Sequence, residues 1–432
     1  MCGLIVAPDR YSDFEMGLAM DQMGYRGQDR LSGLVSDHGW KLGHVRLAIR
    51  DFSPEGAQPF DTPYGPMAFV GEFFSTRGKT EKDYLLGLLD TGEFDRADGF
   101  WSVAGISKAG AYLYTDHLGI KPLYVWPEKG IICSELAPMF LLESPPALDE
   151  IYLSNCIKFG YDYSGRTPYQ GIYQVAPGTR AILKNGQYEA DTYWDWSAVE
   201  GDPRELRGLV REAVHNRLIS DRPVALLLSG GLDSSIIYYT LQEMGRNIEA
   251  FSVENGESEF LPPGVEPLGL EPVTMEQSMR IMQAPLDLGS LLPQIQLAQA
   301  VKAKGYNVVL TGDGADELFG GYRRAAEYDS QHSDVFCELP YYHLPRLDRV
   351  MMRSTIELRS PFLAPSVVAA ALRTPRAERT SKQALKEAFR GLVPDKILDR
   401  EKRPLKSPEV ISGGLSYRQQ LVEEFRRVQP RF

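Results

Sequence analysis

The chain contains little cysteine, and no two of its cysteines are close in sequence. Cys2, Cys133, Cys156 and Cys337 are the four in 432 residues. Their spacing fits neither a zinc site nor the disulfide framework of a small secreted domain. No apolar run approaches the roughly 18 residues that a membrane span requires, and the start of the chain lacks a basic segment followed by an apolar one. We therefore expect a cytoplasmic protein that does not contact a membrane.

The chain also has fewer basic residues than acidic ones. The chain carries 47 Lys and Arg against 58 Asp and Glu, which gives a formal net charge of -11. This surplus of negative charge argues against a nucleic-acid-binding surface. With 43% hydrophobic and 24% charged residues the composition is that of an ordinary globular protein, and 432 residues are too many for one hydrophobic core. We expect two domains, and the oligomeric state stays open between a monomer and a homodimer.

The stretch at residues 229–235, Ser-Gly-Gly-Leu-Asp-Ser-Ser, predicts a phosphate-binding loop. It follows an apolar run at residues 224–228, which we expect to be a strand, and precedes a segment at residues 236–244 that can be helical. Glycines let the main chain approach an anion, and the N–H groups of a helix N-terminus point at that anion. The serine hydroxyls add donors, and Asp233 can hold a magnesium ion that binds the same phosphates.

Two interpretations of this loop remain open. One is an ordinary glycine-rich turn between a strand and a helix. The other is a nucleotide site, although not the usual P-loop for γ-phosphate transfer, because no Lys-Ser or Lys-Thr pair follows the glycines. The loop resembles the PP-loop of ATP pyrophosphatases, which bind the pyrophosphate of ATP and transfer AMP.

A second glycine-rich turn is acidic. The predicted strand at residues 307–310 leads into Thr-Gly-Asp-Gly-Ala-Asp-Glu, which places Asp313, Asp316 and Glu317 at the end of the strand. Alternating strands and helices in this half predict a parallel sheet, whose ligands bind at the carboxyl ends of the strands. Carboxylates at that edge suit magnesium and a bound pyrophosphate. Taken alone, the same residues also fit a solvated acidic turn.

Cys2 is a candidate nucleophile. Removal of Met1 would leave a cysteine with a free α-amino group, whose pKa of about 7.7–8.0 lets it act as a base near neutral pH. The alternative is the buried start of a strand. The residues that follow, up to about residue 190, predict short strands separated by glycine turns, with little long helical periodicity.

Further motifs in this region resemble, in order and spacing, those of the class II glutamine amidotransferase domain, an N-terminal-nucleophile glutaminase. They lie at residues 26–29, 43–49, 56–59, 71–72 and 116–124. The resemblance implies that Cys2 attacks the glutamine amide, giving a thioester and ammonia. It also implies that Arg46 binds the glutamine α-carboxylate, that Glu72 lies near the α-amino group, and that Glu81 fills a second acidic position.

One departure from that family affects the expected rate of glutamine hydrolysis. The family usually has an asparagine, whose side chain donates to the oxyanion, directly before the Gly71-Glu72 pair, whereas this chain has Val70. The N–H of Gly71 remains as a donor. Loss of one oxyanion donor typically costs about 10²–10³ in rate. We therefore predict a weakened glutaminase.

The later motifs resemble those of asparagine synthetases that hydrolyse glutamine. They lie at residues 311–322, 357–363, 381–382 and 400–403. The resemblance implies that Asp233 and Asp316 bind magnesium, that Lys402 lies over the α-phosphate, and that Asp313, where the family usually has glutamate, assists the amine. The contacts that it implies for ATP or pyrophosphate are Leu228, Ser229, Gly230, Gly231, Asp233, Ser234, Ser235, Val253, Gly312 and Lys382.

This resemblance covers about residues 1–410 and implies a fold as well as a reaction. The expected fold is an N-terminal-nucleophile α-β-β-α sandwich over residues 1–196, followed over residues 203–432 by an α/β parallel-sheet ATP pyrophosphatase domain. The expected substrates are ATP, aspartate, and glutamine or ammonia, with magnesium as the cofactor. An aspartyl adenylate would form first, and ammonia would reach it through an internal tunnel.

Three alternatives stay open. The same chemistry can act on another carboxylate, β-lactam-forming relatives share the second half, and a binding protein could keep the ATP contacts without turnover. Val70, Asp313 and the short Pro- and Gly-rich segment at residues 254–282 favour these alternatives. Cys2, Arg46 and Glu72 weigh against the β-lactam-forming alternative, and the complete loop at residues 229–235 weighs against the binding protein.

Overall fold

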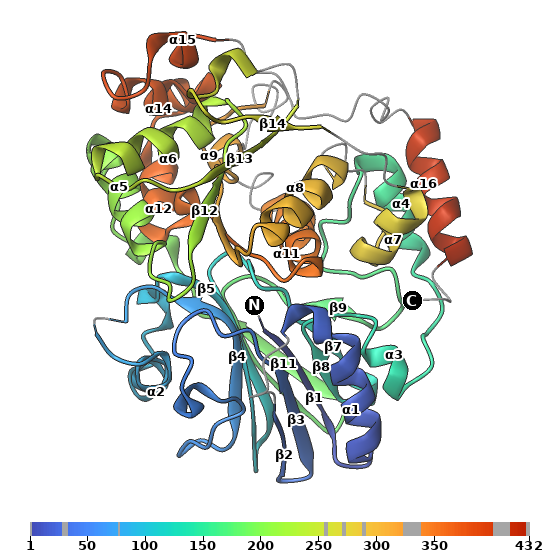
Figure 1. Cartoon of the computed structure of the whole chain (residues 1–432). Helices are drawn as coiled ribbons and strands as arrows, with labels where there is room; N and C mark the ends of the chain where they lie inside the picture. Colours follow the sequence, from blue (N-terminus) through green and yellow to red (C-terminus); the bar gives the residue numbers. More distant parts are fainter. Residues whose placement is uncertain are drawn as a thin grey trace.

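Two antiparallel sheets form the centre of the N-terminal part of the chain (Figure 1). They belong to a computed structural model that describes residues 2–27, 33–76, 78–254, 258–269, 274–286, 291–322, 338–400 and 415–428. The first sheet has the order β2 (Gly33–Asp37), β3 (Trp40–Val45), β1 (Gly3–Pro8), β8 (Ile131–Cys133), β7 (Tyr124–Trp126) and β9 (Tyr173–Gln174). The second has the order β11 (Gln187–Thr192), β10 (Thr179–Lys184), β6 (Gly110–Thr115), β5 (Gly99–Ser107) and β4 (Met67–Phe73).

The two sheets share an apolar core. Side chains alternate along a strand, so residues two apart in β1 face the same side. Leu4 and Val6 belong to one buried cluster with Ala68 and Val70 of β4, and this cluster lies between the sheets. The facing surfaces of both sheets are therefore apolar, as in a β-sandwich.

Helices cover the outer face of each sheet. The β1 residue Ile5, which points away from the second sheet, packs in a cluster with residues of α1 (Asp13–Gln22) and α3 (Met139–Leu142). On the other side, α2 (Glu81–Thr91) contributes to a cluster with Phe69 and Phe73 of β4. These four layers confirm the predicted α-β-β-α sandwich.

A fully parallel sheet forms the centre of the C-terminal part, which begins at α5 (Leu206–Asn216). Its order is β14 (Pro267–Leu268), β13 (Ala250–Val253), β12 (Val224–Leu227), β15 (Val308–Leu310) and β16 (Glu357–Arg359). Figure 1 shows α5, α6 (Leu232–Glu243) and α12 (Pro365–Arg373) on one side of this sheet and α8 (Leu291–Ala303) and α11 (Leu344–Arg353) on the other. The predicted α/β parallel-sheet fold is confirmed.

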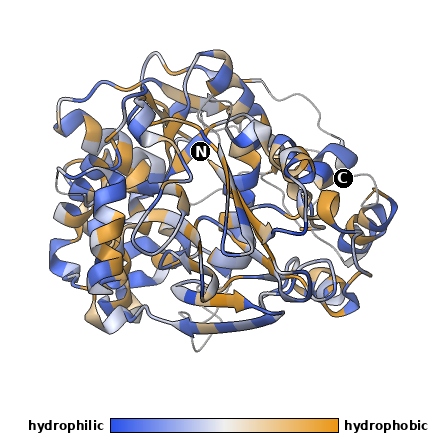
Figure 2. Ribbon diagram, turned by 90° about the horizontal axis from the view of Figure 1, so that it is seen from below, coloured by the Kyte–Doolittle hydropathy of each residue, from blue (hydrophilic) through white to orange (hydrophobic). Residues whose placement is uncertain are grey.

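The remaining helices surround these layers. They are α4 (Glu150–Phe159), α7 (Met275–Met282), α9 (Ala315–Leu318), α13 (Arg376–Arg379), α14 (Gln383–Ala388), α15 (Asp395–Leu398) and α16 (Leu415–Val428). Figure 2 shows the helices striped with polar and apolar residues, while strands near the centre are largely apolar. Over the described ranges, no helix combines the length and the apolar character that crossing a membrane requires.

Helix α11 is buried along almost its whole length, and both parts of the chain contact it. Its residues from Leu344 to Met352 are all buried, although Arg346, Asp348 and Arg349 are charged. Buried charges are tolerated when they are paired and hydrogen-bonded. The partners of these three side chains lie in the two candidate sites and in the contact between the two parts, so α11 positions all of these regions.

Candidate active sites

Cys2 directly precedes β1 and lies inside the sandwich. Its side chain is 7% exposed, and its Sγ lies 4.0 Å from the backbone oxygen of Leu47. Burial raises the pKa of this thiol from 9.0 to about 11; among smaller effects, the charge of Glu72 raises the pKa and that of Arg46 lowers it. These charges act on the thiol because they are close to it. The structure thus brings together three of the predicted glutaminase residues.

Two motif glycines make room for Arg46. A side chain at Gly27 would collide with the backbone of Arg46, and one at Gly56 would collide with its guanidinium. The buried guanidinium donates from Nη2 to the backbone oxygen of Asp51. Arg46 is therefore held in one orientation by backbone contacts, which suits a planar fork of donors for a carboxylate.

Glu72 and Glu81 converge on an arginine that the motifs did not identify. Arg50 Nη1 lies 3.9 Å from Glu72 Oε2 and 3.5 Å from Glu81 Oε1, and Glu81 Oε1 also accepts the N–H of Phe73 at 2.8 Å. Burial, and then the charge of Glu81, raise the pKa of Glu72 well above 4.5. Within the described residues, Glu72 Oε2 accepts no hydrogen bond. This buried oxygen is available to a ligand ammonium.

The neighbourhood of Val70 is apolar. Val70 is 1% exposed and shares its buried cluster with Cys2. The next residue, Gly71, has φ of +108°, a conformation that favours glycine. Its cross-strand partner Trp101 directs both its N–H and its C=O to Asp116, at 3.1 and 3.0 Å, so neither group pairs with Gly71. Gly71 N–H is the predicted oxyanion donor that this strand retains.

The loop at residues 229–235 joins β12 to α6. Ser229 N–H donates to Ser234 Oγ at 3.1 Å, and Gly231 N–H donates to Ser229 Oγ at 3.2 Å. Gly230 has φ of +75°, and Gly231 caps α6, whose first turn contains Asp233 and the buried Ser235. The serines therefore fix the shape of the loop, and the N-terminal N–H groups of a twelve-residue helix face the space that it encloses.

The neighbouring strands bring the other predicted ATP residues to the same edge. Leu228, which follows β12, donates its N–H to the backbone oxygen of Phe251 of β13 at 2.8 Å, and Val253 is the buried last residue of β13. Gly312 follows β15. A Cβ there would lie 2.7 Å from Asp233 Cβ and 2.8 Å from Ser234 N. The loop after β15 thus packs directly on the loop after β12.

Lys382 joins the two predicted magnesium ligands. Its Nζ lies 2.7 Å and 2.5 Å from the two carboxylate oxygens of Asp233, and it also pairs with Asp316. Burial alone would lower the pKa of Lys382, but the two carboxylates outweigh burial and raise it. Lys382 and its neighbour Ser381 both have left-handed backbone angles, with φ of +61° and +55°. A backbone conformation that residues other than glycine rarely adopt therefore directs the Lys382 ammonium toward the two carboxylates.

Two carboxylates held by one cation form a site that suits magnesium. Magnesium usually binds one or two protein carboxylates and completes its shell with water and substrate phosphate oxygens. In the ranges that the structure describes, no group of three or more His, Cys, Asp or Glu is placed to hold a metal on its own. Asp233 and Asp316 therefore fit a metal that arrives with a nucleotide. Lys402 lies outside the described residues.

Asp313 lies near charged residues of α9, of α11 and of the π-helical segment Leu339–His343 that leads into α11. Its Oδ1 is 3.8 Å from Arg346 Nη2, and burial raises its pKa. Nearby, Glu317 Oε1 accepts the hydroxyl of Tyr322 at 2.6 Å and lies 3.4 Å from His343 Nε2. Sequence reasoning missed Arg346 and His343 because no local pattern distinguishes them from surface residues.

A hollow lies between the two candidate sites. Its lining residues from the N-terminal part are Phe100, Ile120 and Lys121, and those from the C-terminal part are Leu344, Leu347, Asp348, Leu358, Ser360 and Leu363. Phe100 is the cross-strand partner of Glu72, and Ser360 Oγ donates to the backbone oxygen of Asp313 at 2.5 Å. The hollow thus adjoins both sites and is lined mainly by apolar side chains.

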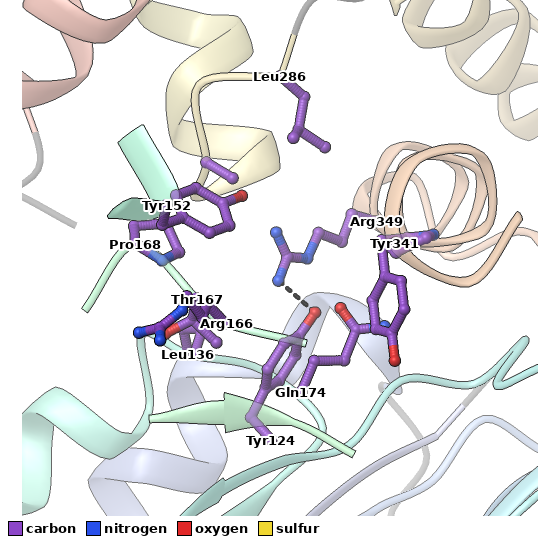
Figure 3. A pocket seen from close by; sticks show the side chains of 12 residues that line it. Tyr124, Leu136, Tyr152, Arg166, Thr167, Pro168, Gln174, Leu286, Tyr341 and Arg349 are labelled. Atoms are coloured by element: carbon purple, nitrogen blue, oxygen red, sulfur yellow. Dashed lines mark hydrogen bonds between the residues drawn. The ribbon is translucent and has the colours of Figure 1, made fainter. Parts of the chain in front are cut away.

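A second hollow also lies between the two parts, and Figure 3 shows side chains from both around it. Arg349 of α11 donates from Nη2 to the hydroxyl of Tyr124 at 2.5 Å, the bond drawn in Figure 3. The other cation in the lining, Arg166, pairs with Asp149 at 2.8 Å. The cations here are engaged by the protein itself.

Two family models match the chain. The model described as "Glutamine amidotransferase domain" matches residues 1–82 and 86–194. The model described as "Asparagine synthase" matches residues 205–262, 269–336 and 328–424. The two matches follow one another along the chain and together span most of it.

Individual relatives are distant. The chain is 25% identical to a probable asparagine synthetase (glutamine-hydrolyzing) of Acanthamoeba polyphaga mimivirus, over 93% of this chain and 84% of that protein. It is 26% identical to the amidase chry2 of Gibberella zeae, over 71% of this chain and 55% of that protein, so it spans about half of that relative. A solved structure of the allosteric regulatory enzyme of purine biosynthesis matches with a TM-score of 0.34 and 11% identity, over 84% of this chain and 80% of that one. That structural likeness is too distant to support an argument. On the two family matches, the chain belongs to the glutamine-hydrolysing asparagine synthetase family.

Proposed function

We propose that this protein makes asparagine from aspartate, using ATP for activation and glutamine as the source of ammonia. The observation that carries the proposal is that one chain holds two different centres. One has a buried cysteine beside Arg46 and Glu72, and the other has a glycine- and serine-rich loop beside paired carboxylates. We further propose that the first centre belongs to a domain at residues 1–196 and the second to a domain at residues 203–432.

At the first centre, Cys2 would attack the side-chain amide of glutamine. Its thiol has a raised pKa of about 11, so it needs a base, and removal of Met1 would supply the α-amine of the same residue. Arg46 would bind the substrate α-carboxylate, and Glu72 Oε2, which accepts no hydrogen bond from the described residues, would accept one from the substrate ammonium. Gly71 N–H would donate to the oxyanion, ammonia would leave, and water would release glutamate.

At the second centre, the aspartate side-chain carboxylate would attack the α-phosphorus of ATP and expel pyrophosphate. The loop at residues 229–235 would hold that pyrophosphate, with Lys382 as an added cation. Asp233 and Asp316 would hold magnesium, which when bound reduces the charge on the leaving group. Asp313 would assist the amine that attacks the resulting adenylate, and Lys402 would neutralise charge at the α-phosphate.

The hollow between the centres supports internal transfer of ammonia. Its lining is mainly apolar, which suits a neutral molecule, and it includes Phe100, the cross-strand partner of Glu72, and Ser360, which donates to the backbone oxygen of Asp313. Ammonia released at Cys2 would therefore reach the adenylate without passing through bulk water.

Pyrophosphate release tests the proposal. Wild-type protein should release pyrophosphate and form asparagine with aspartate, ATP, magnesium and either glutamine or ammonia. A Cys2→Ala variant should lose the glutamine-dependent reaction and keep the ammonia-dependent one. Loss of both reactions in a folded Cys2→Ala protein would contradict the scheme of two centres.

A second candidate acceptor class rests on Asp313. Its side chain is one methylene shorter than the glutamate expected from the resemblance, and Arg346 lies 3.8 Å from it, so the proposed acceptor pocket would differ at this position. The same adenylation could then serve another carboxylate. Pyrophosphate release measured across a panel of amino-acid and aryl carboxylates, each with ammonia, separates the two: activity with aspartate alone would exclude the second candidate.

A further inference from the structure

One carboxylate of α11 connects the C-terminal part to the N-terminal part. Asp348 Oδ2 accepts from Arg26 Nη2 at 2.8 Å, and Asp348 Oδ1 accepts from Lys121 Nζ at 3.0 Å. The three side chains are 0–2% exposed, and 322 positions separate Arg26 from Asp348. Each oxygen of one buried carboxylate therefore binds a cation from the other part of the chain.

Arg26 continues this connection to the candidate nucleophile. Its Nε donates to the backbone oxygen of Cys2 at 3.0 Å, and its Nη1 donates to Glu135 Oε1 at 2.5 Å. A guanidinium is a rigid planar fork, so the position of one of its bonds constrains the others. Asp348 and Glu135 fix the plane of Arg26, and that plane fixes the carbonyl of Cys2.

The same helix also reaches the second centre. Arg346, two residues before Asp348, lies beside Asp313. Lys121 and Asp348 both line the hollow between the centres. Arg349, the residue after Asp348, donates from its guanidinium to the hydroxyl of Tyr124 in the N-terminal part (Figure 3). Helix α11 is therefore in contact with the adenylation centre, the hollow and the residue that holds Cys2.

We propose that Asp348 is a positioning residue of the glutaminase, through which α11 of the C-terminal part holds Arg26 and hence Cys2 in the orientation for attack on glutamine. This rests on the proposed role of Cys2. The carboxylate is fully charged at working pH: burial would raise the pKa of Asp348, but the two cations outweigh burial and lower it to about 2. A nucleophile displaced by about 1 Å can lose about 10²-fold in rate, so loss of this contact should act on catalysis more than on binding.

The test uses full-length Asp348→Asn. An amide nitrogen cannot accept, so one of the two cations loses its partner, while the shape of the side chain is kept. We expect kcat for glutamine hydrolysis to fall by about 10- to 100-fold with a change in KM of less than about 3-fold. Ammonia-dependent pyrophosphate release should stay near the wild-type rate. A merely structural role would instead lower the folded fraction and both activities together.

Asp98→Asn is a matched control. It breaks another ion pair between the two parts, because Asp98 Oδ1 accepts from the buried Arg217 Nη2 at 2.7 Å. In Asp98→Asn, kcat for glutamine should stay within about 3-fold of wild type. Equal losses of kcat in both variants would overturn the proposal, since any broken contact between the parts would then suffice.

Arg26→Lys covers the case in which Asp348→Asn does not fold. It keeps the buried positive charge but removes the fork that reaches Cys2. Labelling of Cys2 by a diazoketone analogue of glutamine, followed by mass spectrometry on folded protein, should slow by at least about 10-fold. Wild-type labelling and hydrolysis rates in this variant would overturn the inference alone. Absence of both reactions in the wild type would overturn the inference together with the proposed glutaminase.

Discussion

Replacing Lys382 with methionine should change metal binding and ATP binding in opposite directions. In the structure the Lys382 ammonium lies between Asp233 and Asp316, at 2.5 Å from the nearer Asp233 oxygen. A divalent ion that binds these carboxylates must displace it. A hydrogen bond to a charged group contributes about 1.5–3 kcal/mol, so removing this competitor should tighten binding of Mn²⁺ to nucleotide-free protein by about 10- to 150-fold. Binding of ATP should weaken, because the pyrophosphate loses a cation.

Mn²⁺ titrations followed by electron paramagnetic resonance, with and without a non-hydrolysable ATP analogue, measure both effects. Lys396→Met is the control, since Lys396 is an exposed lysine that donates to the backbone oxygen of Glu259 at 3.3 Å and lies outside the site. It should leave both affinities unchanged. Weaker Mn²⁺ binding by nucleotide-free Lys382→Met would refute the reasoning, because it would mean that the lysine organises the carboxylates rather than competes for them.

Three further outcomes follow. Gly312→Ala should weaken ATP binding in calorimetry by about 1–3 kcal/mol with glutamine hydrolysis unchanged, because its Cβ would lie 2.8 Å from Ser234 N; unchanged ATP affinity would contradict this. Glu72→Gln should raise KM for glutamine. In the wild type the free energy of unfolding should fall as pH rises above about 4.5, because the pKa of Glu72 is raised in the folded state, and this fall should be absent from Glu72→Gln; urea unfolding across pH measures the difference. Burial lowers the pKa of His44 to about 3, so the free energy of unfolding of the wild type should fall on acidification below pH 6.5. This fall should be smaller in His44→Gln, and an equal dependence of the unfolding free energy on pH in both proteins would contradict the prediction.

The strand, loop and helix around residues 229–235 were predictable because their signal is local. Strand, glycines, serines and helix follow one another within about twenty residues, and the structure has β12, the loop and α6 in that order. The predicted helix at residues 236–244 begins four residues later than α6, which starts at Leu232. Gly231 caps the helix, and Asp233 in its first turn favours the positive end of the helix dipole, so the polar residues that looked like loop are helical.

Helix α1 shows the opposite case. Its apolar residues do not all face the core, since Phe14 is 74% exposed and Leu18 is 42% exposed while Met16 and Ala19 are buried. The apolar residues of α1 therefore do not follow a clear helical period in the sequence. For this reason residues 1–190 are predicted to contain little long helix. The capping box of Ser12 and Glu15 is the local signal that identifies where this helix begins.

The ionic contacts that organise both sites could not be predicted. Arg50 has Glu72 and Glu81 as partners, and Lys382 has partners that lie 149 and 66 positions away. A charged residue has no sequence period that reports its partner, and an isolated one is usually exposed. Only the fold, by burying these side chains, makes each of them a defined contact.

If Cys2 has the proposed role, two features of its surroundings should combine to make ammonia production slow. The thiol of Cys2 has a pKa raised to about 11 by burial, so little thiolate exists at neutral pH without the base. The position that carries the second oxyanion donor in the family is Val70, and its buried, apolar cluster leaves the Gly71 N–H as the predicted donor. Both effects act on attack at the glutamine amide, and neither acts on adenylation. Ammonia supplied from solution bypasses them, so the ammonia-dependent rate should exceed the glutamine-dependent one; the reverse order would mean that another group supplies the missing donor.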